Sequence, residues 1–144
     1  MPEKETVERA QKLKREGKAP STQAGEFVRE EIEHIREGEH GARSTKQAIA
    51  IGLAKARRAG VKLPATKGAS KKTRKQAARD IQKGKSKTKK SAKRSRAATK
   101  ALKREGRSAA SKTALSRQAR AAAKKRSAAS RSRSAKKAAR TRKK

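Results

Sequence analysis

Large apolar side chains become rare after Pro64, and this sets the strongest limit on what the chain can fold into. Residues 65–144 contain three large aliphatic residues: Ile81, Leu102 and Leu115. The same segment holds 32 of the 46 lysines and arginines but only two of the 12 acids, in a chain with a formal charge of +34. Low hydrophobicity with high net charge is typical of disorder, because too little apolar surface can be buried to offset chain entropy. We therefore expect a domain boundary at Pro64, with a small helical module in residues 1–64 and a disordered Lys/Arg/Ala/Ser-rich basic tail in residues 65–144.

Residues that favour helix starts and ends divide the first 64 residues. Pro2 with the acids that follow it predicts a first helix that ends before Gly17, and Pro20 marks a break. Apolar residues at helical spacing then predict a second helix that ends at Gly38. Glutamates occupy the opposite face of this helix: Glu26, Glu30, Glu33 and Glu37.

Residues 44–60 predict a third helix with a well-marked start and end. Ser44 as N-cap and Gln47 three residues later match a capping box. Gly60 suits the left-handed position after the helix, where Val61 can pack back on Ala56. In the tail, alanine, lysine and arginine favour a helix, but like charges at i,i+4 oppose it until phosphates bind. The sequence thus predicts a mostly α protein with extensive disorder: a short N-terminal helical hairpin of two or three helices, and a low-complexity basic tail that is helical at most in part.

The stretch GEFVREEIEHIREGEHGARSTKQAIAIGLAKARRAG, residues 25–60, resembles a small bacterial family of uncharacterised proteins. Its members share an HGARSTKQAIAIGL-type core and often carry a Lys/Ala-rich tail, and the family has no settled activity to carry over. In composition the tail is similar to the C-terminal tails of linker histones and bacterial histone-like proteins. It lacks their proline-containing repeats, since no proline follows Pro64.

Few residues offer catalytic or metal-binding chemistry. His34 and His40 lie among acids, but six residues and a predicted helix end separate them, and the chain has no cysteine. We interpret them as two solvated histidines. Glu30 and Glu33 lie on a face predicted to be exposed, with no sign of a pocket for acid–base catalysis. The sequence therefore predicts no enzyme activity, no catalytic residue, no metal and no cofactor.

The extreme basic balance points to a polyanionic partner, and we expect sequence-nonspecific binding and compaction of duplex DNA through phosphate neutralisation. The tail has no Phe, Tyr or Trp to stack on bases, which argues against a dedicated single-strand reader. The basic residues expected to contact nucleic acid begin at the end of the third predicted helix and continue through the tail: Arg57, Arg58, Lys62, Lys71, Lys72, Arg74, Lys75, Lys89, Lys90, Lys93, Arg94, Arg96, Lys103, Arg104, Lys124, Lys125, Arg126, Arg131, Arg133, Lys136, Lys137, Arg140, Arg142, Lys143 and Lys144.

Two alternatives stay open. The first is an RNA-binding or ribosome-associated protein, because an arginine-rich chain can also fold on RNA. The second is an adaptor whose helical module binds a protein partner, or a second copy, while the tail anchors it to a polyanion. The N-terminus has acids where a secretion signal would have an apolar core, and the longest apolar run, residues 48–54, is too short to span a bilayer. These features predict a cytoplasmic, nucleoid-associated protein without a membrane span.

Overall fold

The computed structural model describes residues 2–86 and 88–143, and within them all regular structure is helical. The elements, in chain order, are α1 (Lys4–Arg15), α2 (Pro20–Glu37), α3 (Thr45–Arg58), α4 (Lys71–Lys85), α5 (Ala92–Lys103), the 3-10 helix η1 (Ser108–Ala110), α6 (Lys112–Lys124) and α7 (Ala128–Arg142). The helical character expected from the sequence is confirmed.

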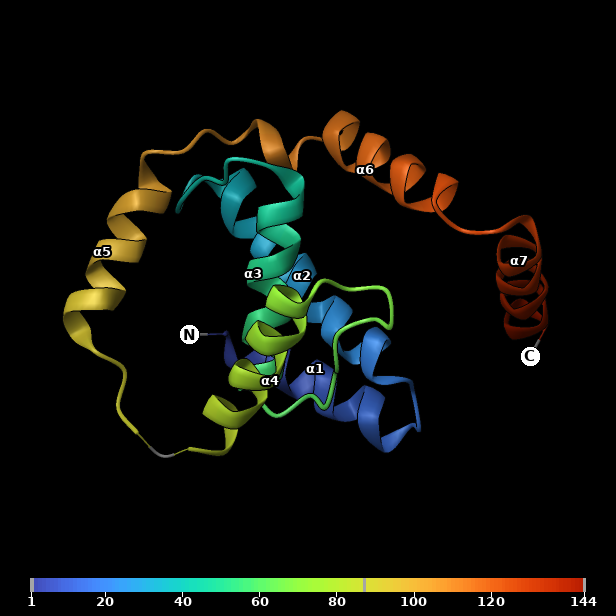
Figure 1. Cartoon of the computed structure of the whole chain (residues 1–144), viewed down its shortest axis with the longest axis horizontal. Helices are drawn as coiled ribbons and strands as arrows, with labels where there is room; N and C mark the ends of the chain where they lie inside the picture. The colour runs from blue at the N-terminus through green and yellow to red at the C-terminus, as the bar shows by residue number, and fades with distance from the viewer. Residues whose placement is uncertain (1, 87, 144) are drawn as a thin grey trace.

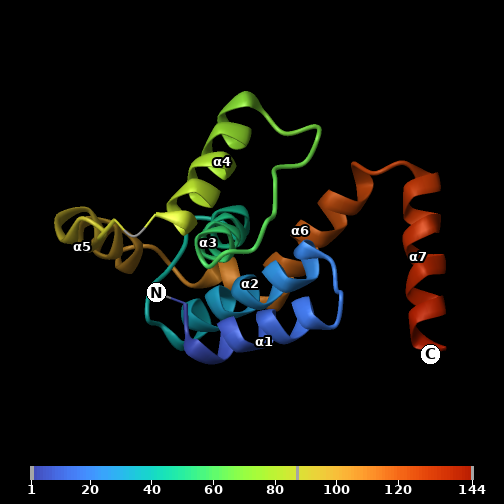
Figure 2. The ribbon, with the colours of Figure 1, turned by 90° about the horizontal axis from the view of Figure 1, so that it is seen from below.

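The first three helices pack around a common core (Figures 1 and 2). α2 packs along α3, and α1 covers another side of α2. Phe27 of α2 is 1% exposed at the centre of the apolar cluster that joins these helices. Its partners come from all three helices and from the chain after α3: Val7, Ala10, Ala24, Leu53, Ala56, Val61 and Leu63.

The predicted ends of α3 are confirmed in atomic detail. Ser44 Oγ accepts a hydrogen bond from the Gln47 N–H at 3.2 Å, and Gln47 Oε1 accepts one from the Arg43 N–H at 2.8 Å. At the other end Gly60 has φ 98°, and the Val61 N–H donates to the Ala56 carbonyl at 3.0 Å. Val61 is buried, so the cap and the apolar contact fix the direction in which the chain leaves α3.

α2 and α3 cross at a point where only glycine fits. A Cβ on Gly52 would lie 2.7 Å from Val28 Cα and 3.0 Å from the Phe27 carbonyl oxygen. Because these are backbone atoms, a side chain at this position would have to push the helices apart.

The prediction of extensive disorder in residues 65–144 is wrong, because this segment forms α4 to α7. Each of these helices starts at a serine whose Oγ accepts a hydrogen bond from the N–H three residues later: Ser70, Ser91, Ser111 and Ser127. An N-cap contributes about 1 kcal/mol. Like-charge pairs at i,i+4 cost only about 0.2–0.5 kcal/mol each. The caps and the abundance of good helix formers therefore outweigh the repulsion that favours disorder.

α4 packs directly on α3, across the boundary expected at Pro64. Ala77 is 2% exposed and Asp80 is fully buried. Arg58 of α3 donates to Asp80 Oδ1 from Nε at 3.0 Å and from Nη2 at 2.7 Å. Ile81 is the one large apolar residue of this helix and is only partly buried, so small residues and an ion pair supply most of the contact.

The segment after α5 also enters the core. Ala109 and Ala110 of η1 are buried in a second apolar cluster with residues of α2, α3 and their connection: Ile32, Ile35, Ala42 and Ala48. Thr45 Oγ1 donates to the Ala109 carbonyl at 2.6 Å, and Arg36 Nε donates to the Ala110 carbonyl at 2.9 Å. The Gly41 N–H donates to the Leu102 carbonyl at 2.9 Å. The chain returns to the first module after α5 and is held there.

α5 and α7 lie away from this bundle, whereas α6 begins against it, with Leu115 packed on the second apolar cluster (Figure 1). α5 lies at one end of the molecule, and α6 leads to α7 at the opposite end. None of these three helices contributes a buried residue. In the described part of the chain, no helix is both long enough and apolar enough to cross a membrane.

Candidate nucleic-acid interface

α5, α6 and α7 carry positive charge without any acid. Their basic residues are Lys93, Arg94, Arg96, Lys100, Lys103, Lys112, Arg117, Arg120, Lys124, Arg131, Arg133, Lys136, Lys137, Arg140 and Arg142. All these side chains are exposed, and none forms an ion pair within residues 2–86 and 88–143. Uncompensated exposed cations are what a phosphate backbone attracts.

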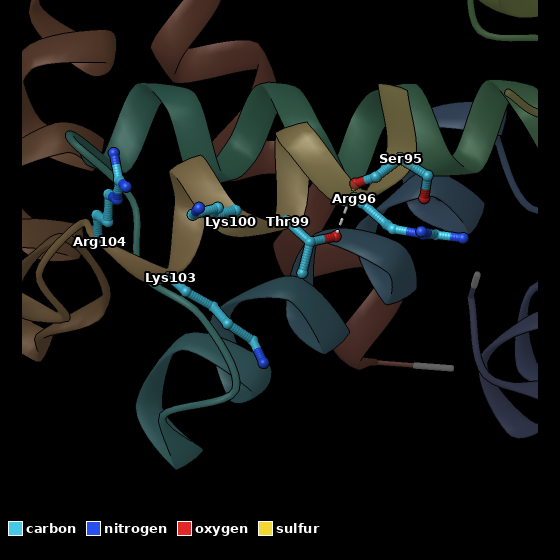
Figure 3. Close-up of a pocket in the computed structure, with 6 residues that line it drawn as sticks. All are labelled: Ser95, Arg96, Thr99, Lys100, Lys103 and Arg104. Atoms are coloured by element: carbon cyan, nitrogen blue, oxygen red, sulfur yellow. Dashed lines mark hydrogen bonds between the residues drawn. The ribbon is translucent and has the colours of Figure 1, made fainter. Parts of the chain in front are cut away.

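One side of α5 forms an open, shallow pocket lined mainly by basic residues (Figure 3). Arg96, Lys100 and Arg104 follow one another at four-residue steps, and Lys103 lies beside them. Ser95 and Thr99 complete the lining, and the Thr99 hydroxyl donates to the Ser95 carbonyl at 3.0 Å. Residues three and four apart share a helix face. α5 and its C-cap residue Arg104 therefore present four cations on one side.

A second basic hollow lies between α4 and the start of α5. Lys75, Arg79 and Lys83 line it from α4, and Arg94 lines it from α5. The two hollows place cations of neighbouring helices around spaces open to solvent, which suits contact with phosphate groups that follow one another along a duplex.

The predicted contact residues at the end of α3 are only partly available for phosphate. Arg58 is held by Asp80, and Arg57 Nε donates to the Leu63 carbonyl at 2.8 Å. Lys62 is exposed in the loop that follows. Arg58 therefore helps to hold α4 on α3, and Arg57 helps to hold the chain that follows α3.

The other predicted residues lie on the surface of α4, α5, α6 and α7 or in their connections, except Lys144, which lies outside the described residues. Arg74 and Arg126 also make local hydrogen bonds, Arg74 to the carbonyls of Lys67 and Ala69, and Arg126 to Ser130 and Ser134. The sequence prediction missed three basic residues that line the hollows: Arg79, Lys83 and Lys100. Four-residue spacing from predicted neighbours is the signal that could have found them.

Replacing Arg58 alone should destabilise the protein more than replacing Arg58 and Asp80 together. Arg58→Ala leaves a fully buried carboxylate without its cation, and we expect a loss of about 2–3 kcal/mol in the free energy of unfolding, since the 39% exposed arginine side chain moderates the effect. The double variant Arg58→Ala/Asp80→Ala removes the buried charge as well and should recover part of that loss. Urea unfolding of both variants measures this, and a double variant less stable than the single one would contradict it.

A polar cluster inside the module differs from the sequence prediction. Glu30 is 2% exposed and Glu31 is fully buried, so the prediction that Glu30 lies on an exposed face is wrong. Lys55 Nζ of α3 lies 3.6 Å from Glu30 Oε1 and 2.7 Å from Glu31 Oε2. His34 is also buried and His40 is partly buried, so the interpretation of two solvated histidines is wrong as well.

Residues 4–67 match the sequence model of a family of unknown function (DUF6496). The match covers α1, α2, α3 and the loop after them, and it includes the residues that carry the resemblance described above. No curated protein and no solved structure matches the chain.

Proposed function

We propose that the protein binds duplex DNA without sequence preference and compacts it, as a nucleoid-associated protein. The observation that carries this proposal is the set of three exposed helices, α5, α6 and α7, that bear basic residues and no acid. Each contacted phosphate releases condensed counterions, which supplies affinity that does not depend on base sequence.

Preformed helices suit this task. An α-helix with its side chains is about 10–12 Å across, and the major groove of B-DNA is about 12 Å wide. Lysine and arginine on an exposed helix can therefore reach phosphates on both sides of the groove. We assign no base contact. Among the described residues, no arginine of α5 or α7 is hydrogen-bonded to the core, so no guanidinium group there is held in a fixed orientation toward a base edge.

The position of the helices supports compaction as well as binding. α5 and α7 lie at opposite ends of the molecule (Figure 2). Basic helices at opposite ends of the molecule can hold two duplex segments at once, and such bridging shortens the path of a long DNA molecule.

Charge removal on α5 tests where binding occurs. The variant Arg96→Gln/Lys100→Gln/Lys103→Gln removes three cations from the pocket in Figure 3 and should weaken duplex binding at 50 mM salt. It should also lower the steepness of the salt dependence by about 0.9 for each phosphate that the variant no longer neutralises. The matched control Lys4→Gln/Lys12→Gln/Lys14→Gln removes the same charge from exposed positions on α1 and should change binding much less.

Fluorescence anisotropy with duplexes of two unrelated sequences, and with a structured RNA at the same phosphate concentration, provides the measurement. Equal losses of affinity in the two triple variants would show an effect of net charge alone and would contradict an interface on α5. A much higher affinity for the RNA would favour an RNA-binding protein, and absence of duplex binding at 50 mM salt would overturn the proposal.

A further inference from the structure

Three metal-ligating side chains meet at the C-terminal end of α2. Glu31 and His34 are three residues apart on one face of the helix, and His40 follows the turn at Gly38. One ligand atom from each of the three lies within 4.8 Å of the others. Gly38 has φ 88°, a left-handed conformation that turns the chain back on itself after the helix. The helix end that separates the two histidines in sequence is therefore what brings them together.

The hydrogen bond of His40 fixes which of its nitrogens can bind a cation. Nδ1 lies 3.1 Å from the Gly41 carbonyl oxygen, which can only accept, so Nδ1 carries a proton. In the neutral ring Nε2 is then an acceptor, and it lies 3.3 Å from Glu31 Oε1, which is also an acceptor. A cation bound between these two atoms, in place of a second ring proton, resolves the conflict. Metal-bound histidines commonly donate their other N–H to a backbone carbonyl in this way.

Buried negative charge in the cluster exceeds the positive charge that faces it. Glu31 is fully buried, and neither of its side-chain oxygens accepts a hydrogen bond from the described residues; the same holds for Glu30 Oε1. Lys55 is the one cation that forms ion pairs with both carboxylates in the described part of the chain. One lysine can balance only one of the two buried carboxylates, and burying an ionised carboxylate without a cation of its own is costly. A second cation beside Glu31 would offset this cost.

Carboxylates also face the other histidine. His34 Nε2 lies 3.3 Å from Glu3 Oε1, and His34 Nδ1 lies 3.7 Å from Glu39 Oε2. Whichever nitrogen binds an ion, the other faces a carboxylate, which is the outer partner that orients many metal-binding histidines. Glu3 is itself held in place, since its N–H donates to Glu30 Oε2 at 3.2 Å.

We propose that Glu31, His34 and His40 bind one Zn²⁺ ion. Two histidines and one carboxylate form a known zinc ligand set, and tetrahedral Zn²⁺ with bonds of about 2.0–2.2 Å places its ligand atoms about 3.3–3.5 Å apart. The distance of 3.3 Å between His40 Nε2 and Glu31 Oε1 matches this spacing. Two imidazoles disfavour Mg²⁺ and Ca²⁺, which select oxygen ligands. The ion would tie the turn after α2 to α2 itself, with the fourth position left for water or Glu39.

Zinc titration of the full-length protein, made without a histidine tag and stripped with a chelator, tests the site. Competition with a chromophoric chelator should show one Zn²⁺ bound per chain, and Co²⁺ should give the visible absorption of a tetrahedral site. Zn²⁺ should also raise the midpoint of thermal unfolding. His40→Ala should weaken binding by more than about 100-fold, since loss of an outer partner alone typically costs about 10–100-fold.

Glu37→Gln is the matched control, because Glu37 is an exposed acid on the same helix. It should bind Zn²⁺ like the parent protein. Circular dichroism shows whether His40→Ala keeps its helices, and if it does not, His40→Gln replaces it. The proposal would be overturned if the His40 variant bound one Zn²⁺ with unchanged affinity. It would also be overturned if the parent protein bound Zn²⁺ weakly and without a 1:1 stoichiometry, or if bound Co²⁺ did not give a tetrahedral spectrum. None of these measurements uses nucleic acid, so they test the zinc site independently of the DNA-binding proposal.

Discussion

Raising the salt concentration from 50 to 200 mM should weaken duplex DNA binding by about 10³–10⁵-fold, for 6–10 contacted phosphates. The physical reason is that most of the proposed affinity comes from counterions released by phosphates on contact with Lys and Arg. The cations of α5, α6 and α7 are exposed and no acid shares these helices, so salt competes for them directly.

The measurement is a set of anisotropy titrations at several salt concentrations with two duplexes of unrelated sequence. A plot of the logarithm of the binding constant against the logarithm of the salt concentration should be linear, with a slope of about −5 to −9 for the same number of phosphates. Both duplexes should give the same line. A slope near zero, or a large difference between the two sequences, would contradict nonspecific electrostatic binding.

Gly52→Ala should reduce the free energy of unfolding by about 3 kcal/mol, near the upper end of the usual cost of overpacking. The added Cβ would lie 2.7 Å from Val28 Cα, and a backbone atom cannot move aside as a flexible side chain can. α2 and α3 would have to separate, which would weaken both apolar clusters of the bundle.

Gly25→Ala is the control, because a Cβ at that exposed position in α2 meets no atom within 4 Å. Replacing a helical glycine by alanine should stabilise the protein by about 0.5–1 kcal/mol. Glycine-to-alanine replacement should therefore raise the free energy of unfolding at Gly25 in α2 and lower it at Gly52 in α3. Urea unfolding followed by circular dichroism compares the variants, and a Gly52→Ala protein as stable as the parent would show that α2 and α3 do not cross so closely.

The ends of the helices were predictable from sequence, because local chemistry determines them. Ser44, Gly38 and Gly60 lie where capping rules place them, since each satisfies backbone groups within a few residues. The same rules applied to Ser70, Ser91, Ser111 and Ser127 favour helices in the tail. The prediction did not apply these rules to the tail; it relied on the scarcity of large apolar residues and on like-charge repulsion, and it was wrong.

The packing of the tail was not predictable, because it depends on small residues and on close backbone approach. Ala77, Ala109 and Ala110 are almost completely buried although alanine offers little apolar surface. They can pack there because glycines admit the neighbouring backbone: a Cβ on Gly41 would lie 1.9 Å from the Glu105 carbonyl oxygen. No periodicity in the sequence marks such contacts between distant segments.

The site residues also fall into two groups, those that the sequence could predict and those that depend on how distant segments pack. The basic surfaces follow from composition, and four-residue spacing would have added Arg79 and Lys100. Spacing alone could not predict the cluster around Glu31 and His40. The chain must reverse at Gly38 to bring His40 near Glu31, and α3 must pack on α2 so that Lys55 reaches the buried Glu31 carboxylate.

The return of the chain to the core after α5 has a mechanical consequence. The C-terminal end of α5 is fastened to the core, because the Leu102 carbonyl accepts the hydrogen bond from the Gly41 N–H. The helix before it, α4, is held against α3, where Gly84 meets the α3 backbone. α7 follows α6 through residues 125–127, and none of its described residues is buried. Under the proposed function, a duplex bound by α5 would lie close to the core, while α7 would offer a second basic surface whose effective concentration depends on its linkage to α6. Avidity of this kind exceeds the affinity of either arm without any new contact, provided that both can engage at once.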